Sequence, residues 1–118
     1  MTSQDPVWMT QIRRGLIDYF ILSVLSVQES YGYQILKDLS EMGSVSVTES
    51  TLYPALARLK REGYLSMRKI RSEQGPSRNY YSVTRLGESH RDAIFAFWKV
   101  MDTDIRSLAR DMDRDGAP

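Results

Sequence analysis

Basic side chains gather in one part of this 118-residue chain. Residues 58–85 hold eight Lys and Arg against two acidic side chains, a local net charge of +6, whereas residues 1–57 carry −3 and residues 86–118 carry −2. A positive segment in a nearly neutral chain is suited to holding a polyanion, because cations that meet phosphates release bound counterions. The alternative is an ordinary solvated surface, so the arrangement of these charges has to decide between the two.

Residues that could support enzymatic chemistry are scarce. The chain has no cysteine and a single histidine, His90, and it shows no metal-spaced cluster, Gly-rich phosphate loop or Ser-His-Asp order. We therefore predict that the protein is not an enzyme, that it holds no metal or cofactor, and that His90 lies on the surface. No apolar run approaches the roughly 20 residues that span a bilayer, and no signal-peptide pattern opens the chain, so we expect a cytoplasmic protein without membrane contact.

The elements that must position the basic residues follow from hydrophobic periodicity. Helices are predicted over 11–27, 32–43, 44–63 and 87–113, and two β-rich runs over 64–70 and 78–84. This order indicates a mainly α fold with a small β-hairpin, which is a winged helix-turn-helix followed by one long C-terminal helix. We predict a DNA-binding domain, a dimerisation helix and a flexible tail over residues 1–85, 86–113 and 114–118.

The third predicted helix has the two faces that a DNA-reading helix needs. Its inward face carries leucines, and its outward face is small near the start and basic further along, with Ser50, Pro54, Ala57 and Arg61. Tyr53 and Arg58 lie on the flanks. Small residues let a helix approach base edges closely, and arginine binds phosphate or guanine. In a winged helix-turn-helix this helix enters the major groove, and the hairpin contacts the flanking backbone.

Pro54 lies in this helix and raises the question of where the helix begins. A start near Ser50 or Thr51 places the proline among the first residues, whose N–H groups have no intrahelical partner. A start at Ser46, which forms a capping-box spacing with Glu49, places it in the interior, where it frees a carbonyl. In both cases Tyr53 and Pro54 lie near the end that would enter a groove.

The predicted hairpin carries four basic side chains around its Gly-Pro turn, Arg68, Lys69, Arg71 and Arg78. Such cations would bind the DNA backbone on either side of the reading helix. Strand alternation places Tyr80 and Tyr81 on opposite faces. One tyrosine then packs on the helices while the other meets solvent or DNA, and the pattern leaves open which does which.

The last predicted helix carries a heptad seam of apolar residues spaced by four and three: Ile94, Trp98, Met101, Ile105, Leu108 and Met112. A seam about three heptads long requires a partner helix. Since three helices and a hairpin already form the rest of the fold, we expect a second copy of the chain to supply it. Leu16 and Phe20 on the first predicted helix would contact the partner's last helix. A two-fold dimer would set two reading helices one DNA turn apart.

Four features together resemble the PadR family of bacterial transcriptional regulators, and its small subfamily in particular. They are YGYQIL (31–36), STLYPALARLKREGYL (50–65), GPSRNYYSVTRLG (75–87) and Trp98. The resemblance implies a homodimeric winged-helix repressor of a palindromic operator. It places DNA contacts on Tyr33, Ser50, Thr51, Tyr53, Pro54 and Arg78, to which the charge pattern adds Arg58, Arg61, Lys69 and Arg71.

The chain departs from the family pattern at two of these positions. Ser50 stands where the family usually has glycine, and Asn79 stands where a basic residue commonly precedes the paired tyrosines. The second departure removes a phosphate-binding charge from the hairpin, and Lys69 and Arg71 are placed to compensate for it.

Aromatic bulk near the start of the last helix allows two interpretations. Phe95, Trp98 and Met101 either belong to the core or form a site for a small planar aromatic effector at the dimer interface. The resemblance implies the second, because multidrug-binding members of the family have a tryptophan at the position of Trp98 beside the ligand. The competing functional class is a winged-helix module that binds another protein instead of DNA. The +6 segment argues against that class.

Overall fold

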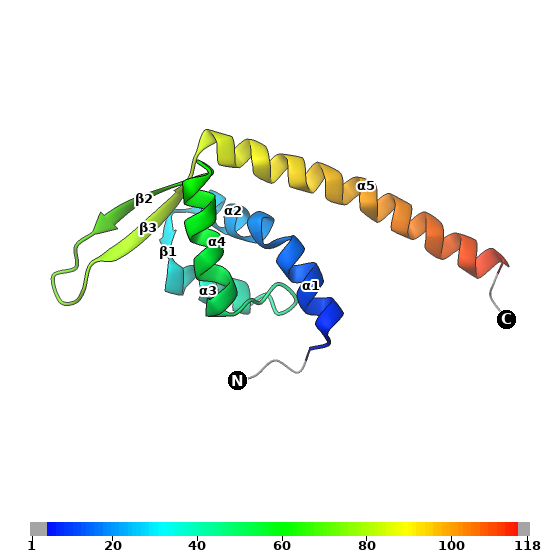
Figure 1. Cartoon of the computed structure of the whole chain (residues 1–118), viewed down its shortest axis with the longest axis horizontal. Coiled ribbons are helices and arrows are strands. Elements are labelled where there is room, and N and C mark those ends of the chain that lie inside the picture. Colours follow the sequence, from blue (N-terminus) through cyan, green and yellow to red (C-terminus); the bar gives the residue numbers. More distant parts are fainter. Residues whose placement is uncertain (1–4, 116–118) are drawn as a thin grey trace.

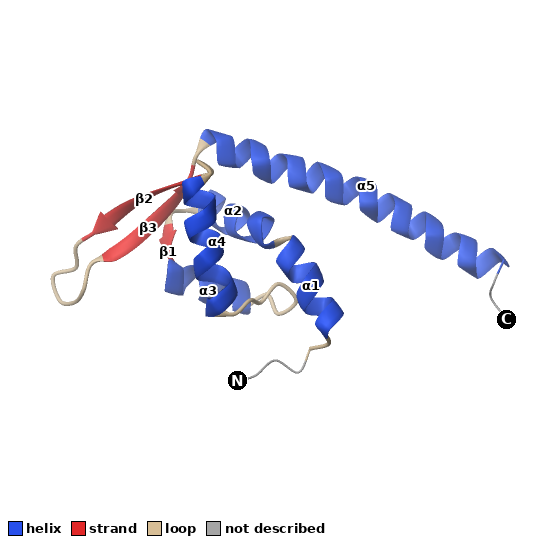
Figure 2. Ribbon diagram, in the orientation of Figure 1, coloured by secondary structure: helices blue, strands red, loops and turns tan. Residues whose placement is uncertain are grey.

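The computed structural model describes residues 5–115. The elements of the described residues follow in the order α1, α2, β1, α3, α4, β2, β3, α5 (Figure 1), and Figure 2 shows the strands β2 and β3 extending away from the helices. Their bounds are α1 Val7–Gly15, α2 Ile17–Val27, β1 Ser30–Tyr31, α3 Gly32–Ser40, α4 Glu49–Arg61, β2 Leu65–Ile70, β3 Arg78–Val83 and α5 Arg85–Asp115. The predicted fold class, a mainly helical winged helix-turn-helix with one long C-terminal helix, is confirmed.

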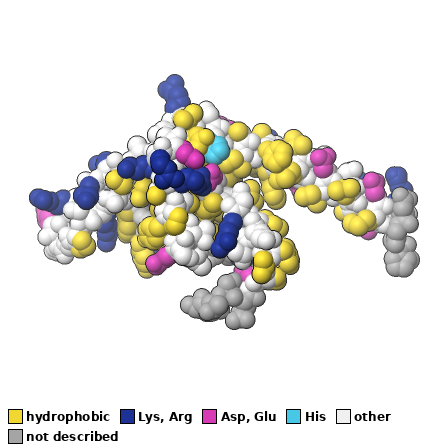
Figure 3. All heavy atoms as spheres, viewed as in Figure 1, with side chains coloured by type: hydrophobic (Ala, Val, Ile, Leu, Met, Phe, Trp, Pro, Cys, Tyr) yellow, Lys and Arg dark blue, Asp and Glu magenta, His cyan; other side chains and the backbone are white. Residues whose placement is uncertain are grey.

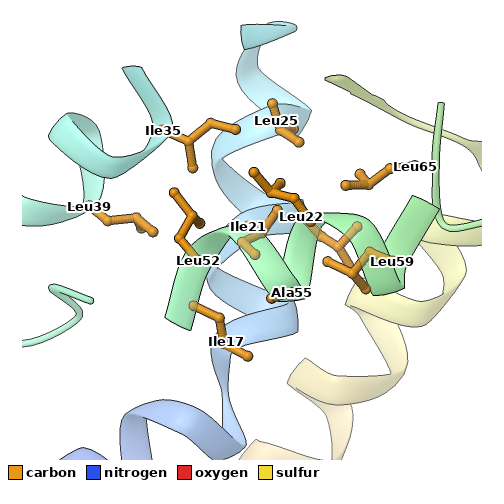
Figure 4. Packing of buried hydrophobic residues seen from close by; sticks show 11 residues of the cluster. Ile17, Ile21, Leu22, Leu25, Ile35, Leu39, Leu52, Ala55, Leu59 and Leu65 are labelled. Carbon is orange, nitrogen blue, oxygen red and sulfur yellow. The ribbon is translucent and has the colours of Figure 1, made fainter. Parts of the chain in front are cut away.

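The core forms where α2, α3 and α4 meet. Leucine and isoleucine side chains from these helices point toward one another in Figure 4, and Leu65 at the start of β2 joins them. In α4 the buried residues Leu52, Leu56 and Leu59 recur at helical spacing, as the sequence predicted. The opposite face of α4 is therefore left to solvent.

The sheet has one strand more than the predicted hairpin. The two-residue strand β1 pairs antiparallel with β3, through Ser30 opposite Tyr81, and gives the strand order β1-β3-β2. Strands β2 and β3 pair from Leu65 opposite Val83 to Ile70 opposite Arg78. We call residues 65–83 the wing; it projects from the body in Figure 1. A two-residue strand has no alternating pattern of its own, so periodicity could not predict β1.

The first predicted helix, 11–27, is wrong as a single element. The chain bends at Leu16, whose φ of −111° and ψ of 7° lie outside helical values, and α1 and α2 run on either side of the bend. Helix α1 has no buried residue, whereas α2 turns Ile17, Ile21 and Leu25 into the core. The bend thus separates a core helix from a surface helix, although the apolar period runs across it.

Helix α4 begins close to the later of the two predicted starts. Its first residue is Glu49, and Thr48 occupies the N-cap position without a capping hydrogen bond from its side chain, so the Ser46–Glu49 capping box is not formed. Pro54 is inside the helix and exposed. Since proline has no N–H, the carbonyl of Ser50 four residues earlier receives no bond from it. At the other end Gly63 adopts a left-handed φ of 87°, which confirms the predicted stop.

A compact turn joins helix α5 to the rest of the structure. The Oγ1 of Thr84 accepts the backbone N–H of Gly87 (3.0 Å) and donates to the carbonyl of Gly63 (2.7 Å), so Thr84 caps α5 and links it to the end of α4. Gly87 is buried against the backbone of Tyr64, and a Cβ there would overlap it.

From this turn α5 leaves the body as a straight arm (Figure 1). It includes residues 114 and 115 of the predicted tail; residues 116–118 of that tail lie outside the described residues. Within residues 5–115, no helix combines the length and the apolar character that crossing a bilayer requires.

Candidate nucleic-acid interface

The outward face of α4 is open to solvent along its whole length. Ser50, Pro54, Ala57 and Arg61 are all exposed, and Tyr53 beside them is 43% exposed. Thr51 is half-buried, and the hydroxyl of Thr48 lies within hydrogen-bonding distance of the hydroxyls of Ser50 (3.0 Å) and Thr51 (3.3 Å). The structure thus leaves a small-residue surface with a basic residue at its far end, as the spacing predicted.

A shallow groove connects the start of α4 with the wing. Its walls bring together the starts of α3 and α4 and strand β3, and they include Tyr31, Tyr33, Tyr53, Tyr81, Arg78 and Asn79. Tyr33 is 62% exposed at the first turn of α3, a helix that starts at Gly32 without a side-chain cap. Uncapped N–H groups at a helix start attract anions, so the groove combines backbone donors, tyrosine hydroxyls and one guanidinium.

Gly32 determines where the Tyr53 ring lies. A Cβ built on Gly32 would overlap Cε1 of Tyr53 and would lie 2.9 Å from its hydroxyl oxygen. The ring therefore occupies the space that any other residue at position 32 would fill. The sequence analysis missed Gly32, because its partner is 21 residues away and no local pattern connects the two.

The cations of the wing have different surroundings. Lys69 and Arg71 are exposed, and the guanidinium of Arg78 lies 4.4 Å above the ring of Tyr31. Arg68 instead bonds the carboxylate of Glu29, which lies just before β1. Figure 3 shows Lys and Arg side chains over the wing and over α4. The exposed wing cations and the outward face of α4 thus form two neighbouring basic surfaces.

Glu29 connects the wing to the body. Its carboxylate accepts the side-chain hydrogen bonds of Arg68 and of Ser82 (3.2 Å), one from each wing strand. The hydrogen bond from Arg68 holds the pKa of Glu29 below its ordinary value. Arg68, one of the four hairpin cations expected to face the DNA backbone, is therefore paired with Glu29 and orients the wing. The sequence analysis gave no role to Glu29.

The two tyrosines of β3 are now distinguished. Tyr81 packs against the core, where burial raises the pKa of its hydroxyl. Tyr80 points to the other face and packs on Tyr31, with ring centroids 5.2 Å apart. The Tyr80 ring thus supports the Tyr31 ring, over which the Arg78 guanidinium lies.

Arg58 differs from the other basic residues of α4 because its charge is already paired. Its guanidinium donates to the two carboxylate oxygens of Asp18 in α2 (2.5 and 3.3 Å) and to Glu62 (3.1 Å). Burial of Asp18 acts to raise its pKa, but the hydrogen bonds from Arg58 and His90 outweigh it and hold the pKa below the ordinary value of 3.8. Arg58 thus has two internal partners on the body of the protein.

The prediction that His90 lies on the surface is wrong. Its side chain is partly buried at the start of α5, Nε2 lies 3.2 Å from Asp18, and the ring stacks on Tyr64 with centroids 4.1 Å apart. The tertiary structure brings Asp18 and His90 together across 72 residues, which no sequence spacing indicated.

The predicted seam of α5 divides into two parts. Near the body the seam residues Ile94 and Trp98, with Phe95 beside them, border a hollow of about 340 Å³ together with Leu16 and Phe20. Further out Ile105, Leu108 and Met112 are more than half exposed on the projecting arm. Yellow side chains follow the arm in Figure 3. Apolar residues at a/d spacing on an otherwise uncovered helix form a surface suited to a partner helix.

The ring of Phe95 already has partners within the chain. It stacks on Tyr19 of α2 (centroids 5.8 Å apart), and the ammonium of Lys99 lies 5.0 Å from its centroid. Trp98 is 37% exposed beside it, and Met101 lies about one turn further along the arm without bordering the hollow. Of the three residues predicted to hold an effector, two therefore line the same space.

The chain is similar to known proteins in sequence and in fold. The profile of the family described as "Transcriptional regulator PadR-like family" matches residues 21–93. A PadR-like transcription factor from Bacteroides fragilis is 36% identical, with a TM-score of 0.72 over 84% of this chain and 95% of that chain. A PadR family transcriptional regulator from Eggerthella lenta is 28% identical, with a TM-score of 0.79 over 86% and 88%.

A further relative, an uncharacterized protein from Lysinibacillus sphaericus, is 29% identical over 91 residues, which are 75% of this chain and 84% of that protein. The matched segment contains most of α2, the whole of α3, α4 and the wing, and the start of α5. Members of the matched family are transcriptional regulators and not enzymes. On the family profile, the fold and the groove between α4 and the wing, this chain belongs to the PadR-like family of DNA-binding transcriptional regulators.

Proposed function

We propose that the protein binds a palindromic operator as a homodimer and represses transcription there. The observation that carries the proposal is the groove that joins the start of α4 to the wing, with Tyr53 on one wall and Arg78 on the other. A helix inserted in the major groove would place Tyr53 and the small residues beside it at base edges, while Arg78 reaches the adjoining phosphates.

The proposed DNA contacts fall into two groups. The reading group lies on the starts of α3 and α4 and consists of Tyr33, Ser50, Thr51, Tyr53 and Pro54. The phosphate group consists of Arg61, Lys69, Arg71 and Arg78. Since Arg58 is paired with Asp18 and Glu62, we assign it no contact with DNA.

The arm supports the dimer. Regulators of this family bind DNA and typically dimerise. Here the seam residues Ile94, Trp98, Met101, Ile105, Leu108 and Met112 would pack against a second copy, together with Leu16 and Phe20. A dimer of this kind is expected to act in the cytoplasm, where the chromosome of a bacterium is accessible. Repression is proposed on the resemblance to the family. A dimer bound to an operator that overlaps a promoter would exclude the polymerase.

The test is selection of bound duplexes from a random pool, followed by footprinting of the selected site. We expect a two-fold symmetric sequence with half-site centres about one helical turn apart, bound by two chains. A protein that recovers no sequence above random DNA, and whose contact with its natural partner is insensitive to heparin and salt, would support the competing class, a winged-helix module for protein binding.

We further propose that a planar aromatic effector acts through the arm. The hollow beside Phe95 and Trp98 supports this, because a guest there would lie between the α1–α2 bend and α5. Such a guest shifts DNA binding only through its different affinities for the two arm positions. The chain has two tryptophans, Trp8 and Trp98, so a Trp8→Phe protein reports on Trp98 alone. Titration of planar aromatic compounds into that protein, with fluorescence and operator affinity measured together, tests the proposal. Quenching of Trp98 fluorescence without a change in operator affinity would contradict the effector proposal and leave Trp98 with a structural role only.

A further inference from the structure

Side chains of three helices, α2, α4 and the arm α5, meet at the carboxylate of Asp18. It belongs to α2, it accepts two hydrogen bonds from the Arg58 guanidinium of α4, and it lies within hydrogen-bonding distance of His90 from α5. The Asp18 side chain is only 19% exposed. A carboxylate that is largely shielded from water and shared by two cationic or polar partners holds them at defined angles, because its lone pairs are directional.

Thr84 ties the C-terminal end of α4 to the start of α5 at the turn, and Asp18 links the two helices away from that turn, through Arg58 and His90. Helix α5 packs mainly on α2 and β3, and α4 packs mainly on α2, α3 and β2. Away from the Thr84 turn, the orientation of the reading helix relative to the arm therefore depends on the packing of both helices on α2. Asp18 is the α2 residue that hydrogen-bonds to both.

We propose that Asp18 is a positioning residue that sets the angle between the reading helix α4 and the dimerisation arm α5. The proposal rests on the dimeric DNA-binding function above. The other charged and aromatic groups at the joint are Glu62, which shares the Arg58 guanidinium, and Tyr64, which stacks on His90. Arg58 then serves DNA recognition by orienting α4, without contacting DNA itself.

The length of the arm makes this angle important. About 25 residues of α5 follow His90, which at 1.5 Å per residue extend roughly 38 Å. A tilt of about 10° at the joint would displace the far end by roughly 7 Å for an arm of that length. The two reading helices of a dimer must meet major grooves about 34 Å apart. A shift of several ångströms between the two heads would therefore weaken binding to two half-sites at once, while each head alone would still fit its own half-site.

Direct contact of Arg58 with phosphate predicts the opposite result for a change at Asp18. Removing the Asp18 charge would release the guanidinium toward DNA and would strengthen binding to any duplex. A positioning role for Asp18 predicts that the same change weakens binding to the complete operator and has little effect on other DNA. The sign of the effect thus separates the two roles of Arg58.

The experiment compares Asp18→Asn, His90→Phe and the wild-type dimer on three duplexes: the selected operator, a duplex with one half-site, and random sequence. His90→Phe keeps a ring to stack on Tyr64 and removes the hydrogen bond to Asp18. Asp92→Asn is the matched control, because it removes the same charge from an exposed position of α5. We expect both joint variants to lose about tenfold on the operator, as for loss of one hydrogen bond to a charged group. We expect less than a twofold change on the other two duplexes, and no change for the control.

Each remaining outcome is informative. Tighter operator binding by Asp18→Asn, or equal losses on the operator and the half-site, would overturn the joint. If Asp18→Asn fails to fold, His90→Phe decides the question, since it leaves the Arg58–Asp18 pair intact. A wild-type protein that selects no two-fold site would overturn the proposed function itself, whereas a two-fold site bound equally by all four proteins would overturn only the role of Asp18.

Discussion

The ring of Tyr53 lies against the α-carbon of Gly32, where a single added methyl group would overlap it. The φ angle of Gly32 is negative, so alanine could adopt the same backbone conformation. The absence of a side chain at position 32 is therefore required by the tyrosine ring and not by the backbone. This makes the contact testable by adding one carbon atom.

We expect Gly32→Ala to weaken operator binding by about tenfold, because the displaced ring removes an aromatic contact worth roughly 1–2 kcal/mol. In a Tyr53→Ala background the same change should cost little, since no ring remains to be displaced. Affinities of the four proteins of this double-mutant cycle measure the coupling. Gly15→Ala, with open space around its Cβ position, is the control. Additive losses would show that Gly32 does not act through Tyr53.

Arg78→Ala should weaken operator and random DNA by similar factors. Its guanidinium lies over Tyr31 at the edge of the groove, where a phosphate is the expected partner. Loss of one phosphate contact reduces the slope of log affinity against log salt by about one. Arg114→Ala, at the far end of the arm, should leave the slope unchanged. A loss confined to the operator would instead identify Arg78 as a reader of bases.

Ile105→Asp should convert the dimer to a monomer. Ile105 lies on the exposed part of the seam, and an unpaired charge buried against a partner helix costs several kcal/mol. Light scattering at micromolar concentration measures the state, and operator affinity should fall with it. Thr103→Asp places the same charge off the seam and should remain dimeric. A wild-type protein that is monomeric at that concentration would refute the dimer.

Asp18 should make stability depend on pH in the acid range. Its pKa is lower in the folded protein than its ordinary value of 3.8, so its contribution is fully present above that value and is lost as pH falls through the folded pKa. We expect the thermal midpoint of the wild type to fall more steeply below about pH 4 than that of Asp18→Asn. Parallel curves for the two proteins would show that the Arg58–Asp18 pair is not maintained in solution.

Hydrophobic periodicity and glycine placement along the chain correctly predicted the buried face and the end of α4. Leu52, Leu56 and Leu59 are buried because their spacing matches the helical period, and Gly63 ends α4 because glycine adopts a left-handed conformation easily. The outward face of α4 followed from the same period. Thr84 as the cap of α5 was also readable in principle, from a threonine directly before a helical pattern.

The missed features depend on residues far apart in the chain. Asp18 meets His90 across 72 residues and Arg58 across 40, and the Gly32–Tyr53 contact joins two helices. Charge patterning showed Arg58 as one cation among eight and could not show that its charge is paired. The bend at Leu16 was missed for a different reason: the apolar period on both sides is the same, and only packing decides which side is buried.

Strand β1 has a consequence for the order of folding. Helices α2, α3 and α4 form a core from a continuous stretch of chain, with contacts that close short loops. Pairing of Ser30 with Tyr81 closes a loop of roughly fifty residues, which carries a larger entropic cost and forms more slowly. We therefore expect the three helices to form the folding nucleus. Docking of the wing onto β1 should then be a late step, so that substitutions in β1 accelerate unfolding more than they slow folding.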